Sequence, residues 1–327
     1  MIKYRAIGAA LVAGMSFGLQ AQLVVTTNQT PQQLVQDVLL GSGVTVSNVS
    51  FNGVLNPATP QPGTGAFTTT SSNLGLGAGI ILSTGLAQNI GQGATGFQSD
   101  LLTPNVSDPD LVAISGGTIN NAAVLEFDFV TTGDSIKFRY VFGSEEYPEF
   151  VCSFNDAFGF FLSGPGISGP YTNGAINIAL LPDGITPVTI NNVNNGDNNN
   201  PNDPFCPAVN PQYYVNNATG TTVVYDGFTV VLEAKRAVQC GETYHIKLAI
   251  GDALDQAYDS GVFLEAGSFT STPFIPSLTP GPGIIGTNTI QESCFPVTID
   301  FQRTGVGTDS DTSVVYIEVG GTATPGV

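Results

Sequence analysis

The residues best suited to chemistry in this chain are oxygen donors gathered in two short segments. The segments, 143–156 and 251–260, together contain seven candidate ligands: Glu145, Glu146, Asn155, Asp156, Asp252, Asp255 and Asp259. Carboxylate and amide oxygens are the ligands that Ca²⁺ prefers in proteins. If the two segments meet, the sequence predicts a Ca²⁺ site or a ligand-binding rim. A solvated acidic loop with an Asn-Asp turn stays open as the alternative.

Each acidic segment adjoins stretches with the pattern of buried strands. Phe138, Tyr140 and Phe142 alternate with other residues before the first segment, and residues 158–162 form a short apolar run after it. Residues 244–250 alternate in the same way before the second segment. Alternation of period two and short apolar runs both indicate strands. We therefore expect both segments at one end of a β-sandwich, with their carboxylates at its rim.

The clearest predicted hairpin joins residues 124–130 to residues 136–142 through a two-residue turn. Its register places Glu126 opposite Arg139, so that one face carries ion pairs and the other carries aromatic rings. Because an exposed ion pair contributes at most about 1 kcal/mol, the aromatic face is expected to provide the stability.

A single short helix is predicted near the start of the mature chain. Thr30 can cap it, Pro31 suits its first turn and Gln33 can complete a capping box. Gly41 is expected to end it. The stretch 84–121 is polar and Gly-rich with little periodicity. We expect a long surface excursion there, a kind of segment that is often functional.

The composition favours short strands and restricts the partners. The chain has 40 Gly and 21 Pro but only 10% charged residues, which is typical of strands joined by turns. Residues 1–21 have the features of a secretory signal peptide, with Lys3 and Arg5 ahead of an apolar stretch. Without this leader, six basic residues remain against 26 acidic ones, a net charge of −20. Such a surface repels nucleic acid and anionic membranes, and no later stretch is long enough to span a membrane.

The four cysteines are expected in an oxidising compartment, where disulfides form. They are Cys152, Cys206, Cys240 and Cys294, and three pairings are possible. We favour a Cys152–Cys206 bond, because both residues lie in long polar loops. No CxxC motif is present and His245 is the only histidine, so a Cys/His metal site is not expected.

The sequence gives no sign of an enzyme. It contains no Walker A, dinucleotide-binding, HExxH or GxSxG pattern. His245 is predicted on a strand face beside Lys247, as a hydrogen-bonded surface histidine and not a catalytic base. The remaining enzyme option is a carbohydrate-active hydrolase with paired carboxylates, although the chain has no Trp to line a sugar cleft. Its catalytic pair would consist of one glutamate (Glu145, Glu146 or Glu149) and one aspartate (Asp252 or Asp259).

Several segments together resemble one known family. They are GIILSTG near residue 80, FRYVFGSEEYPEFVCSFNDAFGFFLSG, YDGFTVVLEA and TYHIKLAIGDALDQAYDSGVFLEAGSF. They are similar to the choice-of-anchor L domain of secreted bacterial surface proteins, and the resemblance covers about residues 23–270. It implies an extracellular, adhesive or surface-layer role, export by type IX secretion in many members, and no established enzymatic activity. The positions that match include Glu145, Glu146, Tyr147, Asn155, Asp156, Asp226, Asp252 and Asp259.

The C-terminal part resembles a different module. Residues 289–327 are similar to the opening of a Calx-beta domain, through TIQESCFPVTIDFQRTG and SVVYIEVGGTATPGV. They contain two predicted strands, 297–302 and 313–319. About 40 residues cannot bury a sandwich core alone, so we expect this module to be completed elsewhere. Cys294 is then expected to pair beyond Val327.

The sequence thus predicts an all-β protein of several parts. A signal peptide (1–21) precedes a jelly-roll-like β-sandwich with one short N-terminal helix (22–270), a Pro/Gly linker (271–288) and a partial second β-sandwich module (289–327). The predicted function is a non-catalytic extracellular module for adhesion or surface assembly, stabilised by Ca²⁺, with an extracellular glycan or protein as its ligand. A purely architectural spacer without any ligand stays open as an alternative.

Overall fold

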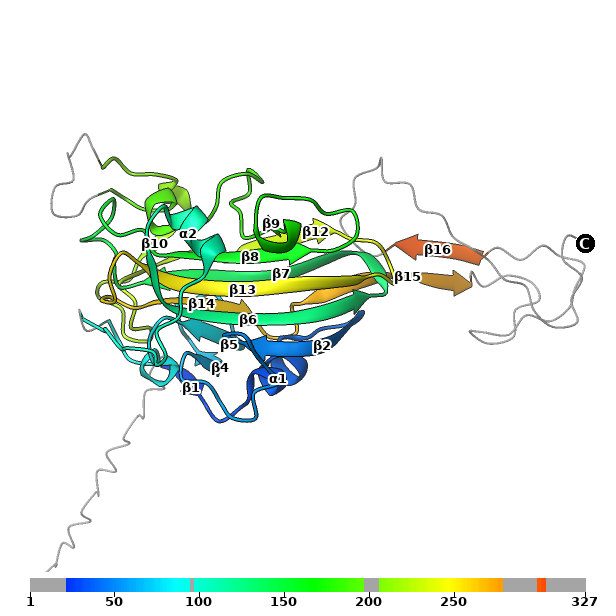
Figure 1. Ribbon diagram of the computed structural model, residues 1–327, viewed down its shortest axis with the longest axis horizontal. Coiled ribbons are helices and arrows are strands. Elements are labelled where there is room, and N and C mark those ends of the chain that lie inside the picture. Colours follow the sequence, from blue (N-terminus) through cyan, green and yellow to red (C-terminus); the bar gives the residue numbers. More distant parts are fainter. Residues whose placement is uncertain (1–21, 95–96, 197–205, 279–298, 304–327) are drawn as a thin grey trace, which may run out of the picture. The chain divides into compact units, whose positions relative to one another are not determined.

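The computed structural model describes residues 22–94, 97–196, 206–278 and 299–303 (Figure 1). Its contacts divide the chain into two compact units, Met1–Ser271 and Thr272–Val327. The first unit contains two antiparallel sheets and little helix, so the predicted all-β sandwich is confirmed. The predicted signal peptide and most of the predicted second module lie outside the described residues.

The two sheets are named here after strands at their centres. The β7 sheet has the order β1 (Gln22–Thr26), β4 (Thr64–Thr70), β5 (Ala78–Ser83), β14 (Ser260–Glu265), β7 (Gly133–Ser144), β11 (Gly227–Thr229) and β10 (Tyr214–Asn216), and β12 (Leu232–Ala237) also pairs with β7. The β13 sheet has the order β3 (Val54–Leu55), β2 (Val44–Phe51), β6 (Ile119–Thr131), β13 (Thr243–Ala253), β8 (Ala157–Ser163) and β9 (Ile176–Asn177). Strand β15 (Thr270–Leu278) begins with the last two residues of the first unit, and in the second unit its residues Phe274–Leu278 pair antiparallel with β16 (Ile299–Arg303).

An aromatic core fills the space between the two sheets. The ring of Phe269 lies 5.3 Å from that of Phe127 and 5.2 Å from that of Phe129, both on β6. It also lies 5.5 Å from the ring of Phe138 on β7, which in turn is 4.8 Å from Phe160 on β8. Alternation along each strand points these rings inward, and burial of each contributes about 1.5–3 kcal/mol. The core thus joins strands of both sheets.

The predicted N-terminal helix forms as expected at its start. In α1 (Pro31–Gln33), the Thr30 side chain accepts from the Gln33 amide while the Gln33 side chain accepts from the Thr30 amide. The turn continues as the π-helix η1 (Leu34–Leu39). Gly41 follows an extended residue, and its backbone lies so close to the carbonyl of Gly267 that a side chain would clash there. The helix therefore ends by packing against the chain near residue 267.

A second helix was not predicted, although its signals are in the sequence. Helix α2 (Pro109–Ser115) lies inside the stretch 84–121 that was expected to be an irregular excursion. Asp108 caps it by accepting from two backbone amides, proline occupies its first turn, and left-handed Gly116 ends it. The described residues also contain four short 3₁₀ helices: η2 (Ala87–Asn89), η3 (Thr172–Gly174), η4 (Ile190–Asn192) and η5 (Pro211–Tyr213).

The predicted hairpin of residues 124–130 and 136–142 is wrong. These residues belong to β6 and β7, which lie in different sheets, and the chain turns a corner between them. Glu126 therefore does not face Arg139; Arg139 pairs instead with Glu265 of β14, at 2.7 Å. Two adjacent strands with matching inner faces can pair in one sheet or pack face to face across a sandwich, and here they do the second.

Candidate functional site

The two predicted acidic segments meet at one end of the sandwich, toward the left of Figure 1. Ser144 at the end of β7 pairs with Ser260 at the start of β14, and the end of β13 is paired with the start of β8. The backbone amide of Glu145 donates to the carbonyl oxygen of Asp259, 3.1 Å away. The register of the strands therefore brings both segments together.

A third segment, residues 97–100, lies against the other two. The Asp259 amide donates to the carbonyl oxygen of Gln98 at 2.9 Å, and the Gln98 amide donates to the carboxylate of Glu145. The Asp100 amide lies 3.1 Å from each carboxylate oxygen of Asp259. Both carboxylates are thus covered by backbone from the stretch that the sequence marked as a surface excursion.

Two further carboxylates lie beneath these, completely buried. Asp156 accepts from the backbone amide of Ala253 at 2.7 Å and from the hydroxyl of Ser260 at 2.6 Å. Asp252 accepts from the side-chain amide of Asn121 at 3.1 Å. Five acidic residues together form the buried carboxylate cluster: Glu145, Glu146, Asp156, Asp252 and Asp259.

Five buried oxygens at this site have no hydrogen-bond partner among the described residues. They are Oε1 of Glu145, both carboxylate oxygens of Glu146, Oδ1 of Asp252 and Oδ1 of Asn121. Ionised carboxylate oxygens and amide oxygens can only accept hydrogen bonds, and a buried acceptor without a donor costs about 1–3 kcal/mol. Such a concentration of acceptors is satisfied by protons on the carboxyl groups, by ordered water or by a bound cation.

Burial raises the pKa of every carboxyl group in the cluster. The pKa of Glu145 rises to about 8 and that of Glu146 to about 9, because burial disfavours the charged form and nearby carboxylates repel it. The same two causes raise the pKa of Asp156 and of Asp259 to about 7. They hold the pKa of Asp252 well above its ordinary value. Without a cation, the two glutamates are therefore largely protonated at neutral pH.

The cluster matches a hard cation in the kind of donor it offers. Ca²⁺ takes six to eight oxygen ligands, mostly carboxylates and carbonyls. In the part of the chain that the structure describes, however, no three His, Cys, Asp or Glu side chains are arranged to hold one metal ion. Binding of Ca²⁺ would thus require side chains such as Glu146 and Asp252 to turn toward a common point.

Two of the predicted ligands have other hydrogen-bond partners. The side chain of Asn155 donates to the carbonyl of Ser115 at 3.3 Å and accepts from the amide of Asn191 at 3.0 Å. The carboxylate of Asp255 accepts from the amide of Ala257 at 3.0 Å, within its own turn. These contacts shape the loops around the cluster.

Sequence reasoning missed two polar residues of the site. Asn121 supplies an unpartnered oxygen beside Asp252, and Asp100 accepts from the side chains of Gln98 and Asn89 at 2.6 and 2.7 Å. Both lie in the stretch 84–121, whose polar residues follow no periodic pattern. The signal that would have located Asn121 is its position at the start of the apolar run of β6.

The disulfide expected between Cys152 and Cys206 is present. It joins the first acidic segment to a residue 54 positions later in the chain. Cys240 is a free, exposed thiol, and Cys294 lies outside the described residues. The bond therefore fixes the loop that carries part of the cluster.

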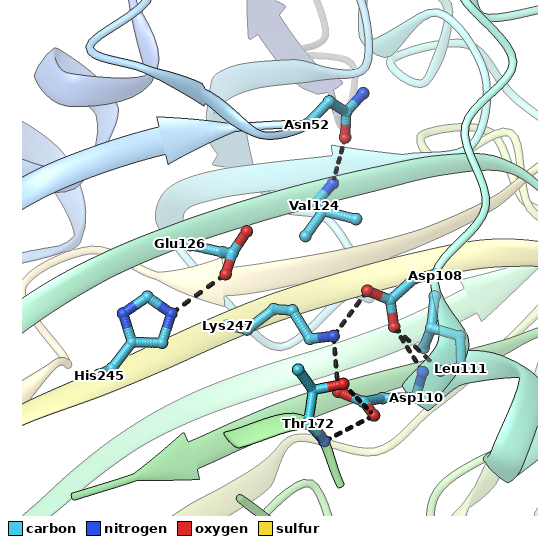
Figure 2. A network of polar contacts seen from close by, with 9 residues as sticks. All are labelled: Asn52, Asp108, Asp110, Leu111, Val124, Glu126, Thr172, His245 and Lys247. Atoms are coloured by element: carbon cyan, nitrogen blue, oxygen red, sulfur yellow. Dashed lines mark hydrogen bonds and ion pairs between the residues drawn. The ribbon is translucent and has the colours of Figure 1, made fainter.

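A separate polar network lies on the outer face of the β13 sheet, and Figure 2 shows it. Lys247 of β13 donates to Asp108 at 2.6 Å and to Asp110 at 2.7 Å, and both acceptors are also bonded to backbone or hydroxyl groups. His245 lies between Glu126 at 3.1 Å and Asp128 at 2.8 Å. The hydrogen-bonded surface histidine predicted beside Lys247 is therefore what the structure has.

This network borders a pocket of about 200 Å³, whose charged lining residues Asp108, Asp110, Glu126, His245 and Lys247 are paired with one another. Lys247 also lies 4.8 Å from the centre of the Phe161 ring. Because Asp108 and Asp110 begin helix α2, the ion pairs fasten that helix to the sheet. The arrangement has a structural role that its bonding explains.

The comparisons with known proteins agree with the resemblance in the sequence. The family model of the choice-of-anchor L domain matches residues 23–270. No curated protein and no solved structure is significantly similar to the chain. No helix in the described part of the chain is long and apolar enough to cross a membrane. Because the match covers most of its length, the chain belongs to the choice-of-anchor L domain family.

Proposed function

We propose that the chain is a non-catalytic module of a secreted surface protein, and that its buried carboxylate cluster binds Ca²⁺. Family membership supports the surface association. The net charge of −18 supports a role for a divalent cation, which would reduce repulsion among the acidic residues. On this proposal the module takes part in adhesion or surface assembly, and Ca²⁺ makes its rim rigid.

The observation that carries the cation proposal is the set of unpartnered buried oxygens. Glu146 is only 1% exposed, and neither of its carboxylate oxygens has a donor among the described residues. Asp252 is 0% exposed, and its Oδ1 atom also has no donor among the described residues. A cation of charge two would satisfy these oxygens and hold both groups ionised. Protons alone would leave the amide oxygen of Asn121 without a donor unless a carboxyl group turned toward it.

The burial of the cluster disfavours the hydrolase alternative. A glycosidase needs one carboxyl group that protonates the leaving oxygen and another that faces the sugar ring. Glu145 and Glu146 are each only 1% exposed, and the segment 97–100 lies over Glu145. A raised pKa suits a general acid, but the group must also reach the substrate. These carboxyl groups face the interior of the protein.

We also propose the finer points that the family resemblance implies. The leader would direct export, type IX secretion would carry the protein out of the cell, and residues 289–327 would begin a Calx-beta-like module. Of that module only β16 (Ile299–Arg303) belongs to the described residues. A detected secreted form without residues 1–21 would support the first of these points.

Thermal unfolding of the mature chain, residues 22–327, tests the cation proposal. Ca²⁺ at millimolar concentration should raise the midpoint by several degrees over the value in EDTA, since a ligand that binds only the folded state stabilises it. Glu146→Gln and Asp252→Asn should each abolish this rise. Glu233→Gln, at an exposed position of β12, is the matched control and should keep it. No shift in the wild type, or a full shift in both cluster variants, would contradict the proposal.

A further inference from the structure

Four aromatic rings form a continuous row beside the buried carboxylate cluster. The ring centre of Tyr258 lies 5.1 Å from that of Phe97 and 4.6 Å from that of Phe150, and Phe150 is 6.0 Å from Phe154. The rings come from three segments that are far apart in the sequence and meet at one end of the sandwich. The aromatic row, as it is named here, consists of Phe97, Tyr258, Phe150 and Phe154.

Apolar side chains in the segments that present this row are exposed to solvent. Phe97 is 59% exposed, Leu101 in the same segment is 63% exposed, and Leu254 beside Asp255 is 53% exposed. Exposed apolar residues scattered singly are ordinary on a protein surface, but several that gather at one end mark an interaction site. Phe97, which belongs to the row, and these two residues of the same segments are such exposed side chains.

The backbone beneath the row is held in conformations that side chains disfavour. Leu254 and Tyr258 both have left-handed φ angles, of 78° and 61°. Leucine and tyrosine rarely adopt this region, and such residues persist only where the surrounding structure fixes them. Here the Ser99 hydroxyl donates to the carbonyl of Gln256 at 3.0 Å, and the Cys152–Cys206 bond fixes the loop between Phe150 and Phe154. The rings are thus presented on a fixed frame.

The three segments that present the row carry one sign of charge. Each segment places a partly exposed acidic residue within three positions of a ring, namely Asp100, Glu149 and Asp255. None of the three segments contains a single Lys, Arg or His. A surface of one sign attracts partners of the opposite sign and repels those of the same sign.

We propose that the aromatic row is a docking surface for a lysine- or arginine-bearing segment of a partner protein. Cationic side chains are attracted to the faces of aromatic rings, and arginine stacks on them most readily. The acidic segments around the row draw the same side chains by charge, and buried aromatic side chains are the usual centres of binding energy at interfaces. This inference goes beyond the proposed function, because it needs neither Ca²⁺ nor an ionised cluster.

Fluorescence anisotropy with a labelled peptide of alternating Arg and Gly tests the proposal on the mature chain. A peptide with Glu in place of Arg and a panel of neutral oligosaccharides serve as the other probes. The variant Phe97→Ser removes the most exposed ring, and Tyr258→Asn removes the central ring while asparagine still accepts the left-handed backbone. The matched control is Val54→Ser with Leu55→Ser, an apolar pair 58% and 59% exposed in β3.

The Arg-Gly peptide should bind the wild type and the control with equal affinity. It should bind the ring variants about tenfold more weakly, and this difference should remain at physiological salt concentration. Equal binding by the ring variants would show charge attraction alone and would overturn the proposal. Binding of saccharides that depends on the rings, equal binding of the Glu peptide, or no binding of the Arg-Gly peptide would also overturn it. If Tyr258→Asn fails to fold, Phe97→Ser alone decides. Each titration is run once in EDTA and once in Ca²⁺. Peptide binding that is equal in both would support the docking proposal even if the cluster binds no Ca²⁺.

Discussion

Asp156 and Ser260 join the two sheets of the sandwich at the rim that carries the cluster. The Ser260 hydroxyl, on β14 of the β7 sheet, donates to Oδ2 of Asp156 at 2.6 Å. The other oxygen of Asp156 accepts from the amide of Ala253, on β13 of the opposite sheet, at 2.7 Å. A single buried carboxylate therefore satisfies donors from both sheets.

Replacing Asp156 by alanine should destabilise the protein strongly. The change leaves two buried donors without an acceptor, and each should cost about 1–3 kcal/mol. Asp156→Asn keeps one acceptor oxygen for the Ala253 amide and should lose less. Urea unfolding of both variants at pH 8 measures the difference. Equal stability of the two variants would mean that the hydrogen bonds of Asp156 contribute little.

The Ca²⁺-free protein should lose stability as the pH rises from 5 to 9. The pKa values of Glu145 and Glu146 in the folded state are about 8 and about 9, above the ordinary value of 4.5. The unfolded chain therefore releases these protons at a lower pH than the folded chain does. The free energy of unfolding falls as the pH rises between these two values, and it stays low once the folded groups have ionised as well. Their stabilising effect is complete below pH 4.5 and is lost as the pH rises through 8 and 9.

Midpoints of thermal unfolding in EDTA at several pH values measure this loss. Glu146→Gln cannot ionise, so its midpoint should fall less steeply with pH than that of the wild type. Glu233→Gln, at an exposed position, should follow the wild type. A midpoint that stays constant or rises between pH 5 and 9 in the wild type would show that the cluster is not protonated in the Ca²⁺-free protein.

Removing the charge of Lys247 should release helix α2 from the sheet. In Lys247→Met, the carboxylates of Asp108 and Asp110 would stay buried without their cation, and breaking a buried pair in this way costs about 3–5 kcal/mol. Lys137→Met, at an exposed position of β7, is the control and should change stability by less than about 0.5 kcal/mol. Guanidinium unfolding compares them, and similar stabilities would contradict the structural role of the network.

His245 should stabilise the protein at low pH more than at high pH. Its pKa is raised from 6.5, first by the hydrogen bond to Glu126 and also by Asp128, although burial opposes the rise. The contribution is complete below pH 6.5 and disappears as the pH rises through the raised pKa. Because the pair is partly exposed, the effect should not exceed about 1 kcal/mol. His245→Gln should therefore be less stable than the wild type at pH 6 and nearly equal to it at pH 9, as measured by thermal unfolding.

The Cys152–Cys206 bond should contribute about 2–4 kcal/mol, since it closes a long loop in the unfolded chain. The Cys152→Ser, Cys206→Ser double variant should unfold at a lower urea concentration by the corresponding amount. Cys240→Ser changes an exposed free thiol and should leave the midpoint unchanged. A double variant as stable as the wild type would mean that the loop is held by its other contacts alone.

The sequence could predict the strands and the acidic segments that adjoin them, because both depend on local patterns. That the two segments meet was a hypothesis, and the pairing of β7 with β14 and of β13 with β8 confirms it. The capping box at Thr30 is local in the same way, whereas the Cys152–Cys206 bond spans 54 positions and was favoured because both cysteines lie in long polar loops. The pairing of β6 with β7 was wrong because alternation shows which face of a strand is buried, and not which strand lies beside it. Arg139 meets Glu265 across 126 positions of sequence, a separation that no local pattern encodes.

The finer composition of the site also depends on contacts between distant residues. Asn121 and Asp252 are 131 positions apart, and only the pairing of β6 with β13 brings them together. The burial of Glu146 could not be predicted either, since a loop with two adjacent glutamates is normally exposed to solvent. The backbone that covers the cluster comes from a segment with no regular pattern.

The order of the strands has a consequence for how the chain comes to be folded. β14 lies between β5 and β7, and β13 lies between β6 and β8, so a central strand of each sheet is synthesised after the strands on either side of it. Neither sheet can assemble until about residue 265 has emerged, and pairings of such long range form slowly. Both sheets are therefore completed only after nearly all of residues 22–265 have been synthesised.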